Sequence, residues 1–147
     1  MIRIVIPGKP RGKASVRGRV AKAKDGRQFV AAHNTTETRN AMAFVRMLAV
    51  EAMQGRPPLD GPIRLEAVLF YQPPARFSKK HRQCALDGYF FPTVKPDASN
   101  WLKLIEDALN GVVFIDDKDV CDVSIRKVYG EVAQQVVCVS LITGERA

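Results

Sequence analysis

The sequence predicts one α+β domain over residues 1–147, with a mixed, mostly antiparallel sheet and two main helices. Three observations support this fold class. Segments with the two-residue period of strands and segments with the 3.6-residue period of helices do not alternate strictly, as a doubly wound fold would require. The length of 147 residues suits one domain with a real core. A hydrophobic content of 46% with 26% charged residues is ordinary for a globular protein.

The first third of the chain predicts strands around a basic segment. Residues 1–6 form an expected strand that Pro7 and Gly8 end. Residues 11–27 are small, basic and interrupted by glycine, which predicts a loop or a loose hairpin with turns at Gly18 and at Asp25-Gly26. Residues 29–32 can add a second short strand.

A long helix and a long strand follow. Thr35 or Thr36 can cap a helix that runs to about Gln54. Its expected buried stripe consists of Ala41, Phe44, Val45, Leu48 and Ala52. Residues 63–71 alternate as a strand with Leu65, Ala67 and Leu69 on one face. Residues 75–92 are expected to form a long loop.

The last part predicts a second helix and two long strands. Asp97, Ser99 or Asn100 can cap a helix that ends near Leu109, before the Asn110-Gly111 turn. Its apolar residues at helical spacing are Trp101, Leu104, Ile105 and Ala108. Residues 112–115 predict a short buried strand, and residues 121–129 and 136–142 predict longer ones.

The positive charge is concentrated at the N-terminus. Residues 1–30 hold nine Lys or Arg and one acid, and this excess equals the net charge of +8 for the whole chain. Such clusters occur on nucleic-acid surfaces, on membrane-binding surfaces and in solvated loops. The absence of amphipathic periodicity disfavours the membrane surface. A second basic cluster spans Arg76 to Arg82, in which His81 is expected to be solvated.

Several classes of protein are disfavoured by composition. No apolar run approaches the roughly 20 residues of a membrane span. The apolar start is too short for a secretory signal. Cys84, Cys121 and Cys138 are odd in number and lack the C-x-x-C spacing of a zinc site, so neither a disulfide framework nor zinc is indicated. We therefore expect a reducing cytoplasm.

Residues 95–122 contain seven of the fifteen carboxylates. Clustered carboxylates repel one another, and a divalent cation with oxygen ligands relieves that repulsion. The alternative is a solvated acidic helix and turn. Asn100, Lys103 and Asp107 share a polar stripe of the expected helix, and the chain's return after it could bring Asp117 beside Asp97. Lys103 could equally be an exposed partner of Asp107.

These residues resemble the signature of the RusA-type Holliday junction resolvases, which reads approximately K-P-D-x-D-N-x-x-K, then D-A-L-N-G, then D-D before a strand. This chain has Lys95-Pro96-Asp97, Asn100 and Lys103, then Asp107 to Gly111, then Asp116-Asp117. The basic segment after the first strand is similar to that family's basic loop. The resemblance covers about 25 residues densely.

The resemblance implies a RusA-like fold and Mg²⁺-dependent cleavage of four-way DNA junctions by a homodimer, encoded by a bacterium or a phage. Mn²⁺ is the alternative ion. Asp97 and Asp117 would be metal ligands, with Asp116 as a further ligand, and Asp97, Lys103 and Asp117 would be catalytic. The expected DNA-binding residues are Lys13, Arg17, Arg19, Arg76, Lys79 and Lys80.

One position departs from the family signature, because Ser99 stands where the family has its second aspartate. Three explanations remain open. Asp116 or Asp107 supplies the missing carboxylate, the protein binds junctions without cutting them, or the serine is an introduced replacement. The functional alternatives are therefore a junction-resolving nuclease and a non-catalytic junction-binding protein. An acid-rich enzyme with a small substrate would leave the basic N-terminus unexplained.

Overall fold

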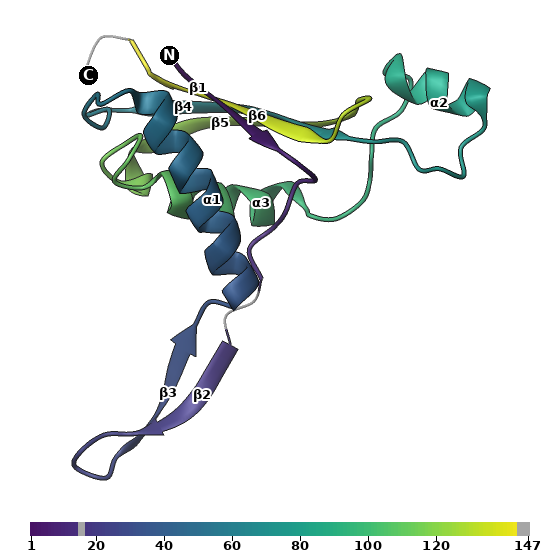
Figure 1. The fold of residues 1–147 in the computed structure, drawn as a ribbon. Helices are drawn as coiled ribbons and strands as arrows, with labels where there is room; N and C mark the ends of the chain where they lie inside the picture. The colour runs from purple at the N-terminus through teal and green to yellow at the C-terminus, as the bar shows by residue number, and fades with distance from the viewer. Residues whose placement is uncertain (15–16, 144–147) are drawn as a thin grey trace.

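The computed structural model describes residues 1–14 and 17–143 of the chain. It contains a four-stranded sheet with α1 and α3 on one face, a separate two-stranded hairpin, and a projecting segment that carries α2 (Figure 1). The elements are β1 (Ile2–Pro7), β2 (Arg17–Lys22), β3 (Gln28–His33), α1 (Thr36–Met53), β4 (Ile63–Tyr71), α2 (Lys79–Leu86), α3 (Ala98–Leu109), the 3₁₀ turn η1 (Asp117–Asp119), β5 (Val120–Tyr129) and β6 (Gln134–Leu141). The predicted α+β fold is confirmed, with α2 as an additional helix.

The sheet has the strand order β1-β6-β4-β5. β6 pairs antiparallel with both β1 and β4, whereas β4 and β5 are parallel. A parallel pair needs a long crossover connection, and the chain between β4 and β5 contains α2 and α3. This connection places α3 on the sheet face that also packs against α1.

The core lies between that face and the two helices. Alternate residues of β1 and β4 point inward, so that Ile4, Leu65 and Leu69 are buried. Trp101 of α3 is fully buried among them, and its indole nitrogen donates to the side chain of Gln135 on β6 across 3.1 Å. The predicted inward faces of residues 63–71 and of α3 are confirmed.

The helix α1 begins and ends at the predicted residues. Thr35 is its N-cap, and the Thr35 side chain accepts a hydrogen bond from the backbone amide of Thr38. The predicted buried stripe was wrong at Phe44, which is 41% exposed. Ala49 is fully buried instead, because the contact line of α1 is rotated toward Val45, Ala49 and Met53.

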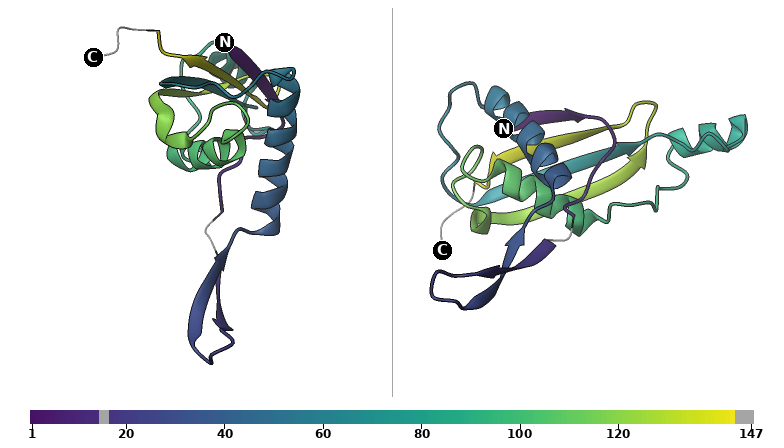
Figure 2. Two further views of the ribbon diagram at one scale, coloured as in Figure 1. Left: turned by 90° about the vertical axis from the view of Figure 1, so that its left-hand side faces the viewer. Right: turned by 60° about the horizontal axis from the view of Figure 1, so that its bottom comes forward.

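The basic segment after β1 forms a hairpin that projects away from the sheet (Figures 1 and 2). Val20 pairs with Val30 at its middle, and both side chains are exposed. The turn predicted at Asp25-Gly26 is present, with Gly26 at a positive φ of 88°. The turn predicted at Gly18 is wrong, because Gly18 lies within β2 opposite Ala32.

The loop predicted at residues 75–92 was wrong in part, because it contains α2. Ser78 caps this helix by accepting a hydrogen bond from the backbone amide of His81. The Phe77 and His81 rings stack with centroids 3.9 Å apart, and Phe77 and Phe90 contact the ring edge of Tyr129 on β5. These contacts attach the projecting segment to the end of the sheet.

The short strand predicted at residues 112–115 was also wrong. This segment is a turn in which Val113 and Phe114 are fully buried, and Phe114 forms only isolated bridges with Leu59 and Asn110. The backbone amide of Gly111 donates to the carbonyl of Phe114 across 2.8 Å, which closes the turn. The apolar residues at 112–115 are therefore explained by burial in a turn and do not indicate a strand. Within the described ranges, none of the helices is long and apolar enough to cross a membrane.

Candidate active site and nucleic-acid interface

Asp97 is the N-cap of α3. Its Oδ2 atom accepts hydrogen bonds from the Ser99 hydroxyl at 2.7 Å and from the Asn100 backbone amide at 3.2 Å. The Ser99 hydrogen bond, the Asn100 amide and the positive charge of Lys103 hold the pKa of Asp97 below its usual value. The exposed N-terminus of α3 therefore presents an ionised carboxylate, with the Lys103 ammonium nearly two turns further along the helix.

Lys127 on β5 holds the backbone of the residues just before Asp97. Its ammonium donates to the backbone carbonyl of Pro96 across 3.0 Å and also to that of Val94. The same ammonium lies 5.3 Å from the centre of the Tyr71 ring. Because Pro96 immediately precedes Asp97, Lys127 ties the start of α3 to the sheet. Sequence reasoning did not identify Lys127, and its position in an alternating strand gave no signal of this contact.

The polar stripe of α3 contacts the segment after β1. The Lys13 ammonium lies 2.6 Å from Oδ2 of Asp107, and the Lys13 backbone amide donates to the Asn100 carbonyl across 3.2 Å. A Cβ atom on Gly12 would lie 2.4 Å from the Asn100 side-chain nitrogen, so a larger residue there would force the Asn100 side chain to shift. The predicted DNA contact Lys13 is thus paired with a carboxylate in this structure.

Asp116 and Asp117 follow the buried turn, where Asp116 is the N-cap of η1 and Asp117 is its first residue. Asp116 accepts a hydrogen bond from the Lys118 backbone amide across 3.3 Å. A hydrogen bond between the two carboxyl groups lowers the pKa of Asp116 and raises the pKa of Asp117. The negative charges of Asp116 and Asp107 raise the pKa of Asp117 further. Asp117 is therefore the member of the pair that holds a proton more readily.

Glu106 is the other member of this acidic neighbourhood. Burial raises its pKa, as do the negative charges of Asp117 and Asp107. The structure thus brings Asp117 toward Glu106 and Asp107, near the C-terminal end of α3. Asp97 lies at the opposite end of that helix, and ten residues of helix between Asp97 and Asp107 correspond to about 15 Å.

Both acidic regions, Asp97 at one end of α3 and the carboxylates around Asp117 at the other, have the chemistry of a site for a hard divalent cation. All their donor atoms are carboxylate oxygens, which Mg²⁺ prefers, and a cation would relieve the repulsion that raises the pKa values of Asp117 and Glu106. Among the described residues, no three Asp, Glu, His or Cys side chains are grouped as a ready metal site. A metal shared by Asp97 and Asp117 stays a prediction.

The remaining predicted DNA-binding residues lie on the two projecting segments. Arg19 is exposed on β2, and Arg17 begins that strand. Arg76, Lys79 and Lys80 are exposed where α2 begins. Two lysines in the first turn of a helix oppose its dipole, so they do not favour the helix itself.

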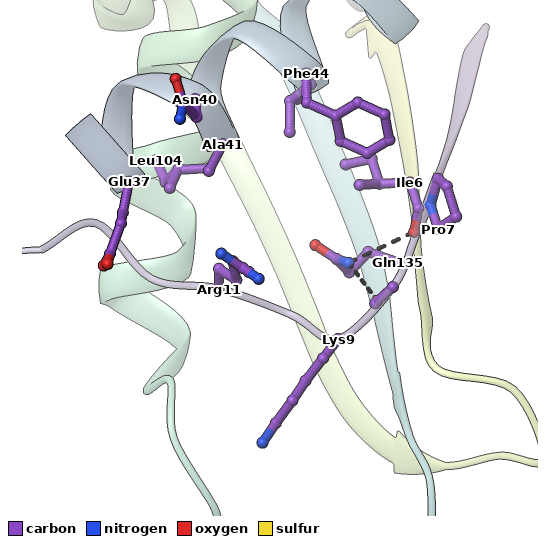
Figure 3. A pocket seen from close by; sticks show the side chains of 12 residues that line it. Ile6, Pro7, Lys9, Arg11, Glu37, Asn40, Ala41, Phe44, Leu104 and Gln135 are labelled. Carbon is purple, nitrogen blue, oxygen red and sulfur yellow. Dashed lines mark hydrogen bonds between the residues drawn. The ribbon is translucent and has the colours of Figure 1, made fainter. Parts of the chain in front are cut away.

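A cavity of about 360 Å³ lies between α1 and the segment after β1 (Figure 3). Gln135 lies at its floor and donates to the backbone carbonyls of Ile6 and Gly8. Through the bond from Trp101, Gln135 links that segment to α3. Sequence reasoning missed Gln135, although a glutamine within an apolar strand was a usable signal of a buried polar contact.

The sequence matches one known protein family over most of its length. The sequence model of the family described as "Endodeoxyribonuclease RusA" matches residues 7–140. A protein of Bacillus subtilis (strain 168) with the name "Uncharacterized protein YqaN" is 28% identical over 134 residues. That alignment covers 88% of this chain and 89% of the Bacillus protein.

Proposed function

The chain belongs to the RusA endodeoxyribonuclease family, and from this membership we propose that it is a Mg²⁺-dependent nuclease that resolves four-way DNA junctions in recombination and repair. The observation that carries the proposal is the exposed Asp97 carboxylate that caps α3, with the exposed Lys103 six residues further along the same helix. The Ser99 hydroxyl and the Asn100 amide lower the pKa of Asp97, with a smaller contribution from the Lys103 ammonium, so Asp97 is held as a carboxylate. An exposed carboxylate and an exposed cation on one helix suit chemistry on a phosphodiester.

Each proposed catalytic residue has a distinct task. Asp97 at the N-terminus of α3, and Asp116 with Asp117 near its C-terminal end, would hold Mg²⁺, or Mn²⁺ in its place. Bound there, the cation would supply charge neutralisation and a more acidic water. Lys103 is exposed, so its ammonium can approach a scissile phosphate and stabilise the negative charge that develops on it. The pKa of Asp117 is raised, so Asp117 accepts a proton more readily than Asp116 does.

DNA binding is assigned to the hairpin and to the start of α2. A junction presents phosphates on four arms, and exposed basic side chains on projecting segments can reach more than one arm. Arg19, Arg76, Lys79 and Lys80 are exposed there, and Arg17 and Lys13 belong to the same basic segment as Arg19. A homodimer would place two active sites across the near-two-fold symmetry of the junction.

A junction-binding protein without cleavage is the second candidate. The observation that favours it is the Ser99 hydroxyl, which donates to Asp97 where the family has a second carboxylate. A neutral ligand in that place weakens the hold on a cation. The basic surfaces do not depend on Ser99, so binding would persist.

Cleavage of a synthetic four-way junction in Mg²⁺ tests the proposal. We expect cleavage by the unchanged chain and a loss of at least roughly 100-fold in Asp97→Asn and in Lys103→Met. Asp60→Asn, an exposed carboxylate change on the loop before β4, is the matched control and should cut normally. Binding without cleavage selects the second candidate. A failure to bind the junction in preference to linear duplex contradicts both.

A cytoplasmic location in a bacterium or in a phage-infected bacterium forms part of the proposal. It is supported by Cys84, Cys121 and Cys138, which are free thiols.

A further inference from the structure

A second cavity, of about 330 Å³, lies where β4 and β5 end. Figure 1 shows that the segment with α2 projects from this end of the sheet. Tyr71 at the end of β4 and Tyr129 at the end of β5 line it, and Ala133 lines it just before β6. Gln72, Lys9 and Val94 complete the rim. The cavity therefore has aromatic walls, with an amide and an ammonium nearby.

The two tyrosines face the same side of the sheet. They are register partners in the parallel pair β4–β5, and partners in register project from the same face. The Tyr129 ring is held by edge contacts with Phe77 and Phe90, whose centroids are each 6.1 Å away. The wall that Tyr129 provides is thus fixed from behind by the segment that carries α2.

Tyr71 supplies an unused polar group. It is only 3% exposed, and its hydroxyl has no hydrogen-bond partner among the described residues. A buried polar atom without a partner is uncommon and costs stability, so it calls for an explanation. Burial raises the pKa of Tyr71, which keeps the hydroxyl protonated and able to donate. The nearby Lys127 ammonium is already committed to the carbonyls of Val94 and Pro96.

The cavity adjoins the proposed active site and a proposed DNA-binding segment. Val94, on its rim, lies three residues before Asp97. Gln72, also on the rim, precedes the segment that leads to Arg76 and Lys79. DNA held by α2 with its backbone at Asp97 would therefore pass this cavity.

We propose that this cavity binds one unstacked nucleobase of the DNA beside the cleavage position. A flat ring stacked against Tyr129 gains stacking energy, and the polar edge of a base can use the amide of Gln72 and the ammonium of Lys9, which line the same cavity. Extruding a base costs least where stacking is already interrupted, as at the branch point of a junction. The inference rests on the proposed function for its DNA substrate, but not on cleavage.

Photo-crosslinking without divalent metal tests the proposal. Junctions carrying 5-iodo-2′-deoxyuridine at successive positions around the branch are bound to the full chain in EDTA and irradiated, and crosslinked residues are mapped by mass spectrometry. We expect crosslinks to Tyr129 or Tyr71 from one or two positions only. Crosslinks confined to other parts of the chain would overturn the proposal.

Two variants and a matched control make the test specific. Ala133→Phe fills the cavity, Tyr129→Leu removes a stacking wall, and Val132→Phe adds the same ring at an adjacent exposed position that does not line the cavity. The first two should lose the crosslink and weaken junction binding by roughly 5- to 100-fold, the range of one base–aromatic stack. The control should resemble the unchanged chain. Equal binding and crosslinking in all four proteins refutes the proposal, provided that their thermal unfolding temperatures agree.

Crosslinking to a single-stranded oligonucleotide that carries the same probe distinguishes the base-site proposal from the proposed junction function. If the chain does not prefer junctions but still crosslinks through Tyr129 in a manner that Ala133→Phe abolishes, the base site stands and the junction function fails. If junction cleavage proceeds while Ala133→Phe changes nothing, the function stands and the base site fails.

Discussion

The Ser99 hydroxyl donates a hydrogen bond to Oδ2 of Asp97 across 2.7 Å. The signature of the RusA family has an aspartate at this position. Serine therefore changes the relationship from two repelling carboxylates to a donor and an acceptor. The hydrogen bond lowers the pKa of Asp97 and makes the end of α3 stable without a cation.

We predict that Ser99→Asp tightens Mg²⁺ binding and raises junction cleavage, because a cation gains an anionic ligand in place of a neutral one. Without metal, the variant should be less stable, because two carboxylates then repel at the N-terminus of α3. Calorimetric Mg²⁺ titration, thermal unfolding with and without Mg²⁺, and cleavage rates measure the three effects. Ser99→Asn, which adds no charge, is the matched control. Equal metal affinity and equal rates at saturating Mg²⁺ would show that Asp116 or Asp107 already fills the role.

We expect the ion pair between Lys13 and Asp107 to contribute little to the free energy of unfolding. The two side chains are 24% and 32% exposed, so water screens their attraction. We expect a double-mutant cycle with Lys13→Met and Asp107→Asn to give a coupling of about 0.5–1 kcal/mol in urea unfolding. Lys79→Met, an exposed lysine for which no ion pair is found within the described part of the chain, should not couple to Asp107. A coupling of zero would mean that Lys13 is free in solution to bind phosphate.

We expect the basic residues of the hairpin segment to contribute to the salt dependence of DNA binding. Neutralising Lys13, Arg17 and Arg19 together should weaken binding and reduce the log–log salt slope by up to about 2.7, since each phosphate contact on duplex DNA contributes about 0.9. Lys13 should contribute least, because its ammonium must first leave Asp107. Fluorescence anisotropy at several salt concentrations measures the slope. An unchanged slope in the triple variant would move the main DNA contact to the segment from Arg76 to Arg82.

We expect that replacing Glu106 stabilises the folded chain, and that the size of this gain depends on pH. The pKa of Glu106 in the folded state is raised by burial and by Asp117 and Asp107, so the folded chain binds a proton more readily than the unfolded chain. Stability then falls as pH rises from the ordinary glutamate pKa through the raised one. Glu106→Gln removes this cost, and we expect it to unfold at a higher temperature at pH 7 in metal-free buffer. The advantage should disappear as pH falls below the ordinary glutamate pKa. Glu51→Gln, an exposed change on α1, controls for the loss of one charge.

Elements with clear local signals were predictable from the sequence. The strand at residues 63–71 has the predicted bounds, and Thr35 caps α1 as its hydroxyl chemistry suggests. Both depend on periodicity and on side chains within a few residues. The helix α2 was missed because its residues, from Lys79 to Leu86, are mostly polar and carry no long apolar stripe. Its attachment relies on the contact of Phe77 with Tyr129, which lies in a different element.

The candidate site shows the same division. The sequence alone offered Asp97, Ser99 or Asn100 as the helix cap and placed Lys103 and Asp107 on one face of that helix, because helical geometry relates residues three and four apart. It could not show that Lys13 reaches Asp107 or that Lys127 binds the carbonyl before Asp97. Those contacts join residues 94 and 31 positions apart.

The sequence by itself determined the α+β class, the capped helix with its acidic and basic groups, and the basic N-terminal segment. Each follows from composition or from short-range backbone geometry. The tertiary structure alone decided that β4 and β5 are parallel neighbours, and this pairing sets Tyr71 beside Tyr129 at one cavity and brings Lys127 to the start of α3. Strand order depends on how whole elements pack to bury their apolar faces, and local periodicity does not specify which faces meet.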